Sequence, residues 1–282
     1  MKQRKSLKEL NLLDKFLFDE AMDDPENVKT MLDIILSQNT SLKYPPQTEK
    51  EQRTSTDNRQ IRLDVYAVDE DDVIYEVEAQ KENTHNLSKR SRLYQGIIDS
   101  KLLPPGVVDF NLLNEVLIVI ITPFDLFGYG LYRYTFQMKC EEVPELKLDD
   151  GATRIFLNTK GIHPELVSPE LIELLKYMEH STDEVSEVCK SKRIQEMHRR
   201  VCRIKASEKT EVKYMQSWEE KILIKQEGIA EGRKLGYEEG EKELLKNLVR
   251  KKLAKNISTE QIAEMLEIDI SEVENIIKEL AK

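Results

Sequence analysis

The chain lacks the features of several large protein classes. Its 282 residues contain no apolar run of 18 or more, which speaks against a membrane-spanning helix. Ten glycines and nine prolines are too few for a low-complexity or collagen-like chain. The motifs GxxxxGK(S/T), GxGxxG and GxSxG are also missing, which argues against P-loop, Rossmann and α/β-hydrolase folds.

Cysteine and histidine are scarce. The three cysteines are an odd number without CxxC spacing, so we expect reduced thiols in a cytoplasmic protein. The four histidines form no HxxxH or HExxH pair, which argues against a zinc site.

Acidic residues outnumber basic ones by 53 to 43, so the formal net charge is −10. Residues 1–180 carry this entire excess, whereas residues 181–282 are neutral. These charges exclude a nucleic-acid binder that is basic overall. Any contact with phosphate must come from a local basic patch or from a metal ion.

The spacing of apolar residues predicts an α/β fold. Two helices are expected within residues 7–37, the second beginning at Pro25. Residues 115–122, EVLIVIIT, form an unbroken apolar run that is typical of a strand buried on both faces. Other segments predict a loop or irregular strand over 38–59, two strands over 60–80, a helix over 87–101, and strands over 131–138 and 153–157. We therefore expect a mixed central sheet flanked by helices.

The chain becomes almost entirely helical from Pro169 onward. We expect three parts: an α/β domain over 1–180, a helical extension over 181–255 and a small module over 256–282. The extension carries glycines spaced four apart, which would form one ridge on a helix: Gly228, Gly232, Gly236 and Gly240. Two interpretations stay open. The segment is a weak helix or flexible linker, since each glycine costs about 1 kcal/mol against alanine, or it makes a close helix–helix contact in a homo-oligomer.

Residues 256–282 have helix-turn-helix form. Ser258 and Ser271 are predicted as helix N-caps, with a short turn around Asp269 between the helices. Glu272 and Glu274 open the second helix and would repel phosphate at the end that should meet DNA. A packing or partner module is therefore favoured over a DNA-reading one.

The two strands within residues 60–80 carry one polar face. With the turn at Asp69–Asp72, Asp64 lies opposite Glu78 and side chains alternate between two faces. The apolar face then holds Leu63, Val65, Ala67, Tyr75, Val77 and Ala79, and the polar face holds Arg62, Asp64, Tyr66, Glu76, Glu78 and Gln80. Facing carboxylates destabilise a ladder unless something compensates their charge. Mg²⁺ or Mn²⁺ suits two carboxylates plus waters; the plain alternative is a solvated sheet face.

Basic residues follow this hairpin within twelve positions: Lys81, Lys89, Arg90 and Arg92. Arg90 and Tyr94 are four apart and share a helix face. Cations beside a metal-binding carboxylate pair are what phosphodiester cleavage needs, because they hold phosphate while the metal neutralises charge. The alternative is a solvated amphipathic helix.

Three segments together resemble a known family. RLDVYAVDEDDVIYEVEAQK, then KRSRLYQ, then IVIITPFDLFGYGLYRYTFQM are similar to the PD-(D/E)xK nuclease-type transposases, the Rpn family of recombination-promoting nucleases. The resemblance spans about residues 6–180. It includes LLDKFLFDEAMDDPENVKTMLDIIL near the N-terminus and extends to the glycine-studded helical tail.

This resemblance implies a restriction-endonuclease-like core and Mg²⁺-dependent DNA cleavage. Asp64 and Glu78 match the two acidic metal ligands, and Gln80 stands where the wider superfamily has lysine. An amide carries no charge, so Gln80 can only orient a water or a phosphate. Glu20 in the first helix is a further acidic candidate. The resemblance and the basic run together give these expected phosphate or DNA contacts: Arg62, Lys81, Arg90, Arg92, Tyr94 and Gln95.

The sequence therefore predicts a Mg²⁺- or Mn²⁺-dependent DNA endonuclease of transposase type, with Asp64, Glu78 and Gln80 at its centre. The rival is a nuclease-fold protein that acts in DNA binding or assembly and has lost efficient cleavage. A helical scaffold acting through its tail is a third class, but it leaves the polar hairpin face unexplained.

Overall fold

A computed structural model describes residues 5–52 and 61–280 of the chain. A six-stranded sheet runs through its first part, in the order β1-β2-β3-β4-β6-β5. The strands are β1 (Gln47–Gln52), β2 (Ile61–Val68), β3 (Ile74–Ala79), β4 (Val116–Thr122), β5 (Arg133–Phe136) and β6 (Ala152–Asn158). The predicted α/β class, with a mixed sheet and flanking helices, is confirmed.

The sheet joins an antiparallel half to a parallel half. β1, β2 and β3 pair antiparallel, β3, β4 and β6 pair parallel, and β5 closes the far edge antiparallel to β6. A tight turn cannot connect parallel neighbours. Helix α3 (Leu87–Asp99) therefore carries the chain from the end of β3 back to the start of β4.

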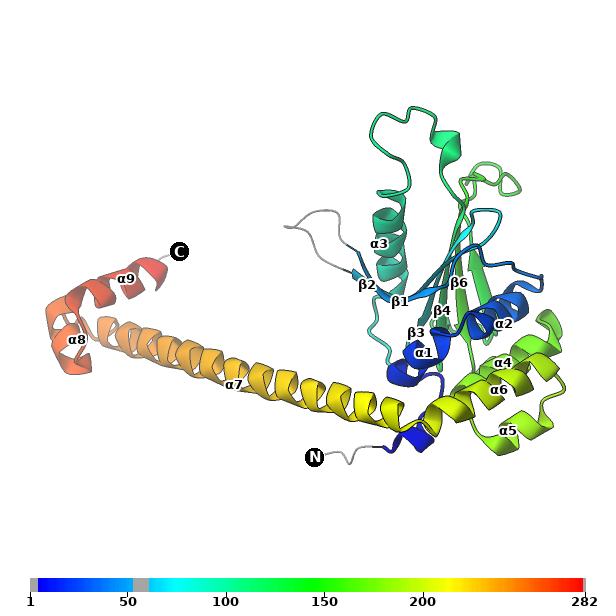
Figure 1. Cartoon of the computed structure of the whole chain (residues 1–282). Helices are drawn as coiled ribbons and strands as arrows, with labels where there is room; N and C mark the ends of the chain where they lie inside the picture. The colour runs from blue at the N-terminus through cyan, green and yellow to red at the C-terminus, as the bar shows by residue number, and fades with distance from the viewer. Residues whose placement is uncertain (1–4, 53–60, 281–282) are drawn as a thin grey trace. The chain divides into compact units, whose positions relative to one another are not determined.

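Helices cover both faces of the sheet, as Figure 1 shows. On one face α3 packs against Ile118 and Ile120 of β4. On the other face, Val119 and Ile121 of the same strand pack against a layer of helices. That layer consists of α1 (Lys15–Met22), α2 (Pro25–Leu36), α4 (Pro169–Glu179) and α6 (Lys192–Lys205), with α5 (Asp183–Val188) beside α4 and α6. The apolar run of β4 thus faces a core on both sides, as predicted.

Short elements complete this part of the chain. Asp24 caps α2 by accepting a hydrogen bond from the backbone N–H of Glu26, and Pro25 is the first helical residue, as predicted. Short 3₁₀ helices lie at Leu7–Glu9, Phe110–Leu112 and Pro164–Leu166.

Two local features differ from the sequence-based expectation. The stretch 38–59 contributes the edge strand β1, whose charged side chains suit an edge because they disfavour pairing with another chain. Residues 53–59 of that stretch, and Gln60, lie outside the described residues. Leu63 packs on the α3 side and not with Val65 and Ala67. The β1–β2 ladder is irregular at this point, where Glu49 has a left-handed φ of 48°.

The chain divides into two compact units, Met1–Tyr214 and Met215–Lys282. This division lies beyond the expected boundary at residue 180, because α6 packs against α1, α2 and α4. The four spaced glycines lie within one continuous helix, α7 (Glu208–Leu253). A Cβ added at any of them would meet no atom within 4 Å in the described part of the chain, so their close contact is not made there.

The second unit ends in two short helices, α8 (Thr259–Leu266) and α9 (Ile270–Leu280). Ser258 caps α8 by accepting from the backbone N–H of Gln261, as predicted. The predicted cap at Ser271 is wrong, since α9 already includes that residue and the carbonyl of Asp269 accepts the first N–H bonds. Among the described residues, no helix combines the length and apolarity needed to cross a bilayer.

Candidate active site

Strand β3 places two carboxylates on the face of the sheet that α3 covers. Its pairing with β2 sets Tyr66 opposite Glu76 and Val65 opposite Val77, in agreement with the predicted register, but the paired ladder ends there and does not include the predicted Asp64–Glu78 pair. On its other side β3 pairs with β4, where Ile118 adjoins Glu76 and Ile120 adjoins Glu78. These two isoleucines belong to the α3-side core, so both glutamates point into an apolar layer.

The carboxylates of this face are buried. Glu76 has no exposed surface, and Asp64 and Glu78 are 7% and 6% exposed. The alternative of a solvated sheet face is therefore wrong. Both carboxylate oxygens of Glu76, and Oε2 of Glu78, have no hydrogen-bond partner among the described residues. Unpartnered buried carboxylates are costly, and they require a proton or a cation.

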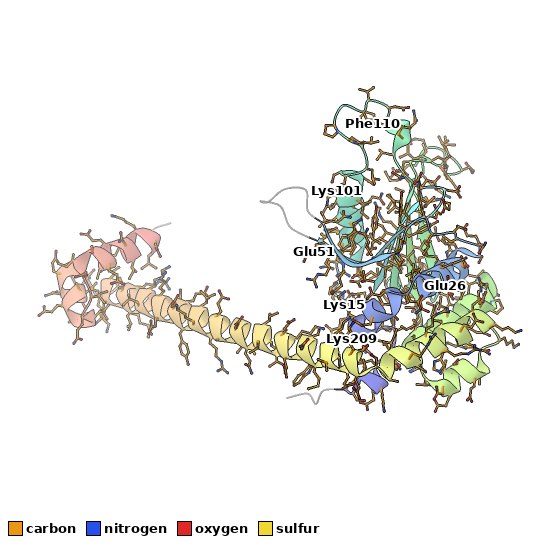
Figure 2. All side chains as sticks on the ribbon, in the orientation of Figure 1. Lys15, Glu26, Glu51, Lys101, Phe110 and Lys209 are labelled. Carbon is orange, nitrogen blue, oxygen red and sulfur yellow. The ribbon has the colours of Figure 1, made fainter. Side chains whose placement is uncertain are left out.

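Two basic side chains reach these acids from opposite sides of the sheet. Lys15, labelled in Figure 2, extends from the first residue of α1, and its Nζ lies 2.5 Å from Oδ1 of Asp64. The same Nζ lies 3.2 Å from Oδ2 of Asp19, one turn further along α1. From α3, the guanidinium of Arg90 pairs with Glu78.

Gln80 belongs to the same network. Its Oε1 accepts a hydrogen bond of 2.8 Å from Arg90 Nη2, and its Nε2 donates to the backbone carbonyl of Glu82. Tyr94 is buried one turn after Arg90, with the guanidinium 5.9 Å from its ring centre. The structure thus brings together the predicted Asp64, Glu78, Gln80, Arg90 and Tyr94.

Burial controls the charge of this site. It raises the pKa of Glu78 to about 7 although Arg90 opposes the shift, and it raises the pKa of Asp19 to about 7 against Lys15. Burial and the carboxylates of Glu78 and Asp64 hold the pKa of Glu76 well above its ordinary value. Asp64 also has a raised pKa because of burial. Without a bound cation, these acids retain protons at a pH where exposed carboxyls are ionised.

Other predicted contacts have different partners. Arg62 is exposed and pairs with Glu49 and Glu51 of β1. Lys81 pairs with Asp14, just before α1, on the opposite face of the sheet from Glu78. This position agrees with the strand alternation expected for Lys81.

Two further predicted residues line a separate hollow. Gln95 is buried, and its Nε2 donates to Asp99 at 2.9 Å, while Arg92 is exposed. Both line a cavity of about 580 Å³ that also includes Arg154. Glu20 pairs with Lys213 at 2.8 Å, so the first helix offers Asp19 to the site instead.

The sequence patterns did not single out Lys15, Asp19 or Glu76 as site residues. The spacing of Lys15 and Asp19, four residues apart, places them on one face of α1, which was an available signal. Glu76 was placed on the polar face but not among the site residues, because its complete burial depends on β4 and α3.

No family model matches this chain, and comparisons with curated proteins and with solved structures also find no match.

Proposed function

We propose that this protein is a metal-dependent DNA endonuclease with a restriction-endonuclease-like core, using Mg²⁺ or Mn²⁺. The observation that carries the proposal is the group of buried carboxylates at Asp64, Glu76 and Glu78, with three of their oxygens unpartnered among the described residues. The resemblance of residues 6–180 to the Rpn nucleases supports the reaction class, which is hydrolysis of phosphodiester bonds in DNA.

The donor set fits a hard divalent ion. Four carboxylates of the site, counting Asp19, face the two cations Lys15 and Arg90, so full ionisation leaves an excess of two negative charges. Asp64 and Glu78 would hold the ion, with the free oxygens of Glu76 beside them. When bound, the ion neutralises charge on the phosphate and activates a water molecule.

The chain's own cations have separate tasks in this proposal. Arg90 fixes Glu78 and Gln80 through its guanidinium and adds positive charge beside the hollow that would receive phosphate. Lys15 supplies the positive charge that Gln80 cannot carry, held against Asp64 by its short contact. Gln80 orients groups through its amide and takes no proton.

A surface hollow beside the site gives room for a nucleic-acid backbone. It has a volume of about 410 Å³ and is lined by Arg62, Lys89, Arg90 and Tyr94, among others. Three cations on one hollow supply a local basic patch on a chain that is acidic overall.

The second candidate is a nuclease-fold protein that binds DNA or assembles without efficient cleavage. The observation that favours it is Gln80, an uncharged side chain already bonded to Arg90 and to a backbone carbonyl. The two candidates differ in one outcome, which is whether a phosphodiester bond is broken.

Supercoiled plasmid incubated with the full chain, with and without Mg²⁺ or Mn²⁺, tests the proposal. We expect metal-dependent nicking that Asp64→Asn and Glu78→Gln abolish, while Glu145→Gln, an exposed acid between β5 and β6, leaves it unchanged. A gel shift with the same plasmid in the absence of nicking would establish the second candidate. Neither binding nor nicking would overturn the endonuclease proposal and the DNA-binding form of the second candidate.

A further inference from the structure

A second group of metal-binding side chains lies on the helical layer and contains no residue of the carboxylate site. His198 and Cys202 are four residues apart on α6 and share a face, and Asp183 is the first residue of α5. Asp183 Oδ1 lies 2.8 Å from His198 Nε2, and Cys202 Sγ lies 3.3 Å from that nitrogen and 3.8 Å from the same carboxylate oxygen. The oxygen, nitrogen and sulfur atoms all lie within 4.8 Å of one another.

A buried tyrosine fixes the imidazole in this orientation. The hydroxyl of Tyr177, a fully buried residue of α4, lies 3.0 Å from Nδ1 of His198, and the two rings meet edge to face. With Nδ1 bound there, Nε2 is the nitrogen that faces Asp183 and Cys202. Histidines that bind metals are commonly held in this way through their second nitrogen.

The geometry does not suit a Cys-His-Asp catalytic triad. In a triad the nucleophile and the carboxylate flank opposite nitrogens of the ring, so that one orients the imidazole while the other exchanges a proton. Here Asp183 Oδ1 and Cys202 Sγ both lie nearer to Nε2 than to Nδ1, and the hydroxyl of Tyr177 occupies Nδ1.

The spacing of the three atoms is close to that of a tetrahedral metal centre. Zinc bonds of about 2.0–2.3 Å at tetrahedral angles place neighbouring ligand atoms about 3.3–3.6 Å apart. The observed separations of 2.8, 3.3 and 3.8 Å bracket that range. Sγ also lies 3.9 Å from Nδ1, beside the imidazole ring, so metal binding requires rotation of the Cys202 and Asp183 side chains, and that of Asp183 is 79% exposed.

We propose that Asp183, His198 and Cys202 form a Zn²⁺ site with three protein ligands and a fourth position open to solvent. A thiolate, an imidazole and a carboxylate select zinc over the hard ions Mg²⁺ and Ca²⁺. The open side faces a pocket of about 390 Å³, which Ser181 and Lys205 also line. An HxxxC pair on α6 is the sequence signal of this site, and a search for paired histidines passes over it.

Cobalt provides a direct test on the full-length, tag-free protein, because a Co²⁺–thiolate bond absorbs light by charge transfer. We expect one equivalent of Co²⁺ to bind with this absorption and one equivalent of Zn²⁺ to remove it. Cys202→Ser should abolish the absorption. Tyr177→Phe, which removes only the hydroxyl that orients His198, should weaken zinc binding by about 10–100-fold with the fold retained by circular dichroism.

Matched variants separate this site from other cysteines and from the carboxylates. Cys140→Ser and Glu78→Gln should leave the cobalt–thiolate absorption and its displacement by zinc unchanged, and Asp183→Asn, at an exposed position, should weaken zinc displacement of that absorption without unfolding. The proposal is overturned by absence of the absorption in the wild-type protein, by its persistence in Cys202→Ser, or by its loss in Cys140→Ser. These outcomes do not depend on nuclease activity.

Discussion

The ammonium of Lys15 lies 2.5 Å from Oδ1 of Asp64 and joins α1 to β2 across 49 positions of sequence. Because Asp64 is buried, its ionised form depends on a nearby positive charge. Asp19 of α1 and Glu49 of β1 lie 3.2 Å and 3.9 Å from the same ammonium, so one cation contacts three carboxylates. If the site cleaves DNA, the ionisation of Asp64 therefore depends on Lys15 of the N-terminal helix α1.

Lys15→Met keeps the aliphatic stem and removes the charge. We expect plasmid nicking at saturating Mg²⁺ to fall by about 10²–10³-fold, because the variant loses the only lysine ammonium that contacts Asp64 in the described structure. Lys81→Met is the matched control, since Lys81 is similarly exposed and pairs with Asp14 on the other face of the sheet. Equal losses in the two variants would show that the Lys15 contact has no special role.

Glu76→Gln replaces a buried acid whose two carboxylate oxygens have no partner among the described residues. Glutamine has nearly the same shape, so we expect the metal-free protein to unfold at the same temperature or higher. Mg²⁺ should raise the melting temperature of the wild type by mass action and that of the variant much less. Thermal melts with and without Mg²⁺ measure both effects, with Glu51→Gln as the exposed control. An identical Mg²⁺ response in wild type and variant would remove Glu76 from the metal site.

Stability of the metal-free protein should fall as the pH rises. Burial raises the pKa of Glu78 and of Asp19 to about 7, whereas carboxyls in an unfolded chain titrate near 4. Between these values the folded protein binds more protons than the unfolded chain. The contribution of protonated Glu78 and Asp19 to the free energy of unfolding is therefore complete below about pH 4 and is lost as the pH rises through 7.

Urea unfolding at about pH 5.5 and about pH 8 measures this loss. For Glu78 the full difference between its folded pKa and its ordinary value corresponds to roughly 3 kcal/mol. Glu78→Gln should reduce the pH dependence, and saturating Mg²⁺ should reduce it in the wild type because the ion binds the ionised carboxylates. A stability that rises over this interval would contradict the raised pKa values.

Residues 1–214 should fold without the remainder of the chain. The sheet, both hydrophobic clusters against it and the carboxylate site all lie within this unit. Circular dichroism and thermal melting of this fragment test the expectation, and the absence of a cooperative transition would refute it.

The helical tail should account for any self-association of the chain. Its glycines have open space around them, and several apolar side chains of α7 are exposed, among them Leu223, Ile224, Leu235 and Tyr237. We expect the full chain to elute as an oligomer and residues 1–214 as a monomer in size-exclusion chromatography with light scattering. A monomeric full chain at micromolar concentration would remove the tail as an association element.

Local patterns were sufficient to predict the hairpin of the site. Strand alternation and the acidic turn place Asp64, Glu76, Glu78 and Gln80 in one register, because a slip by one residue would mix polar and apolar faces. The helix that supplies Arg90 and Tyr94 follows from its apolar spacing, and its packing on the face of Glu78 follows from a right-handed crossover between parallel strands.

The remaining features of the two sites depend on packing between elements far apart in the sequence, which no local sequence pattern predicts. Asp19 and Glu20 are neighbours on α1 but point in directions about 100° apart on a helix, so a small rotation of α1 determines which acid meets Lys15 and Asp64. The depth at which Glu76 is buried depends on β4 and α3 together. The contact of Asp183 with His198 of α6 likewise depends on the packing of α5 against α4 and α6.

Strand β4 seals one side of Glu76 by pairing Ile118 beside it, yet it follows Glu76 by about 40 residues in the order of synthesis. At about 5–20 residues per second, the acids of the site leave the ribosome roughly 2–8 seconds before β4 does. Through that interval the hairpin can keep its carboxylates hydrated and ionised. Closure of the sheet by β4 is then the step at which the nascent chain must take up protons or a cation, so the ionic conditions around the ribosome bear directly on how readily this fold completes.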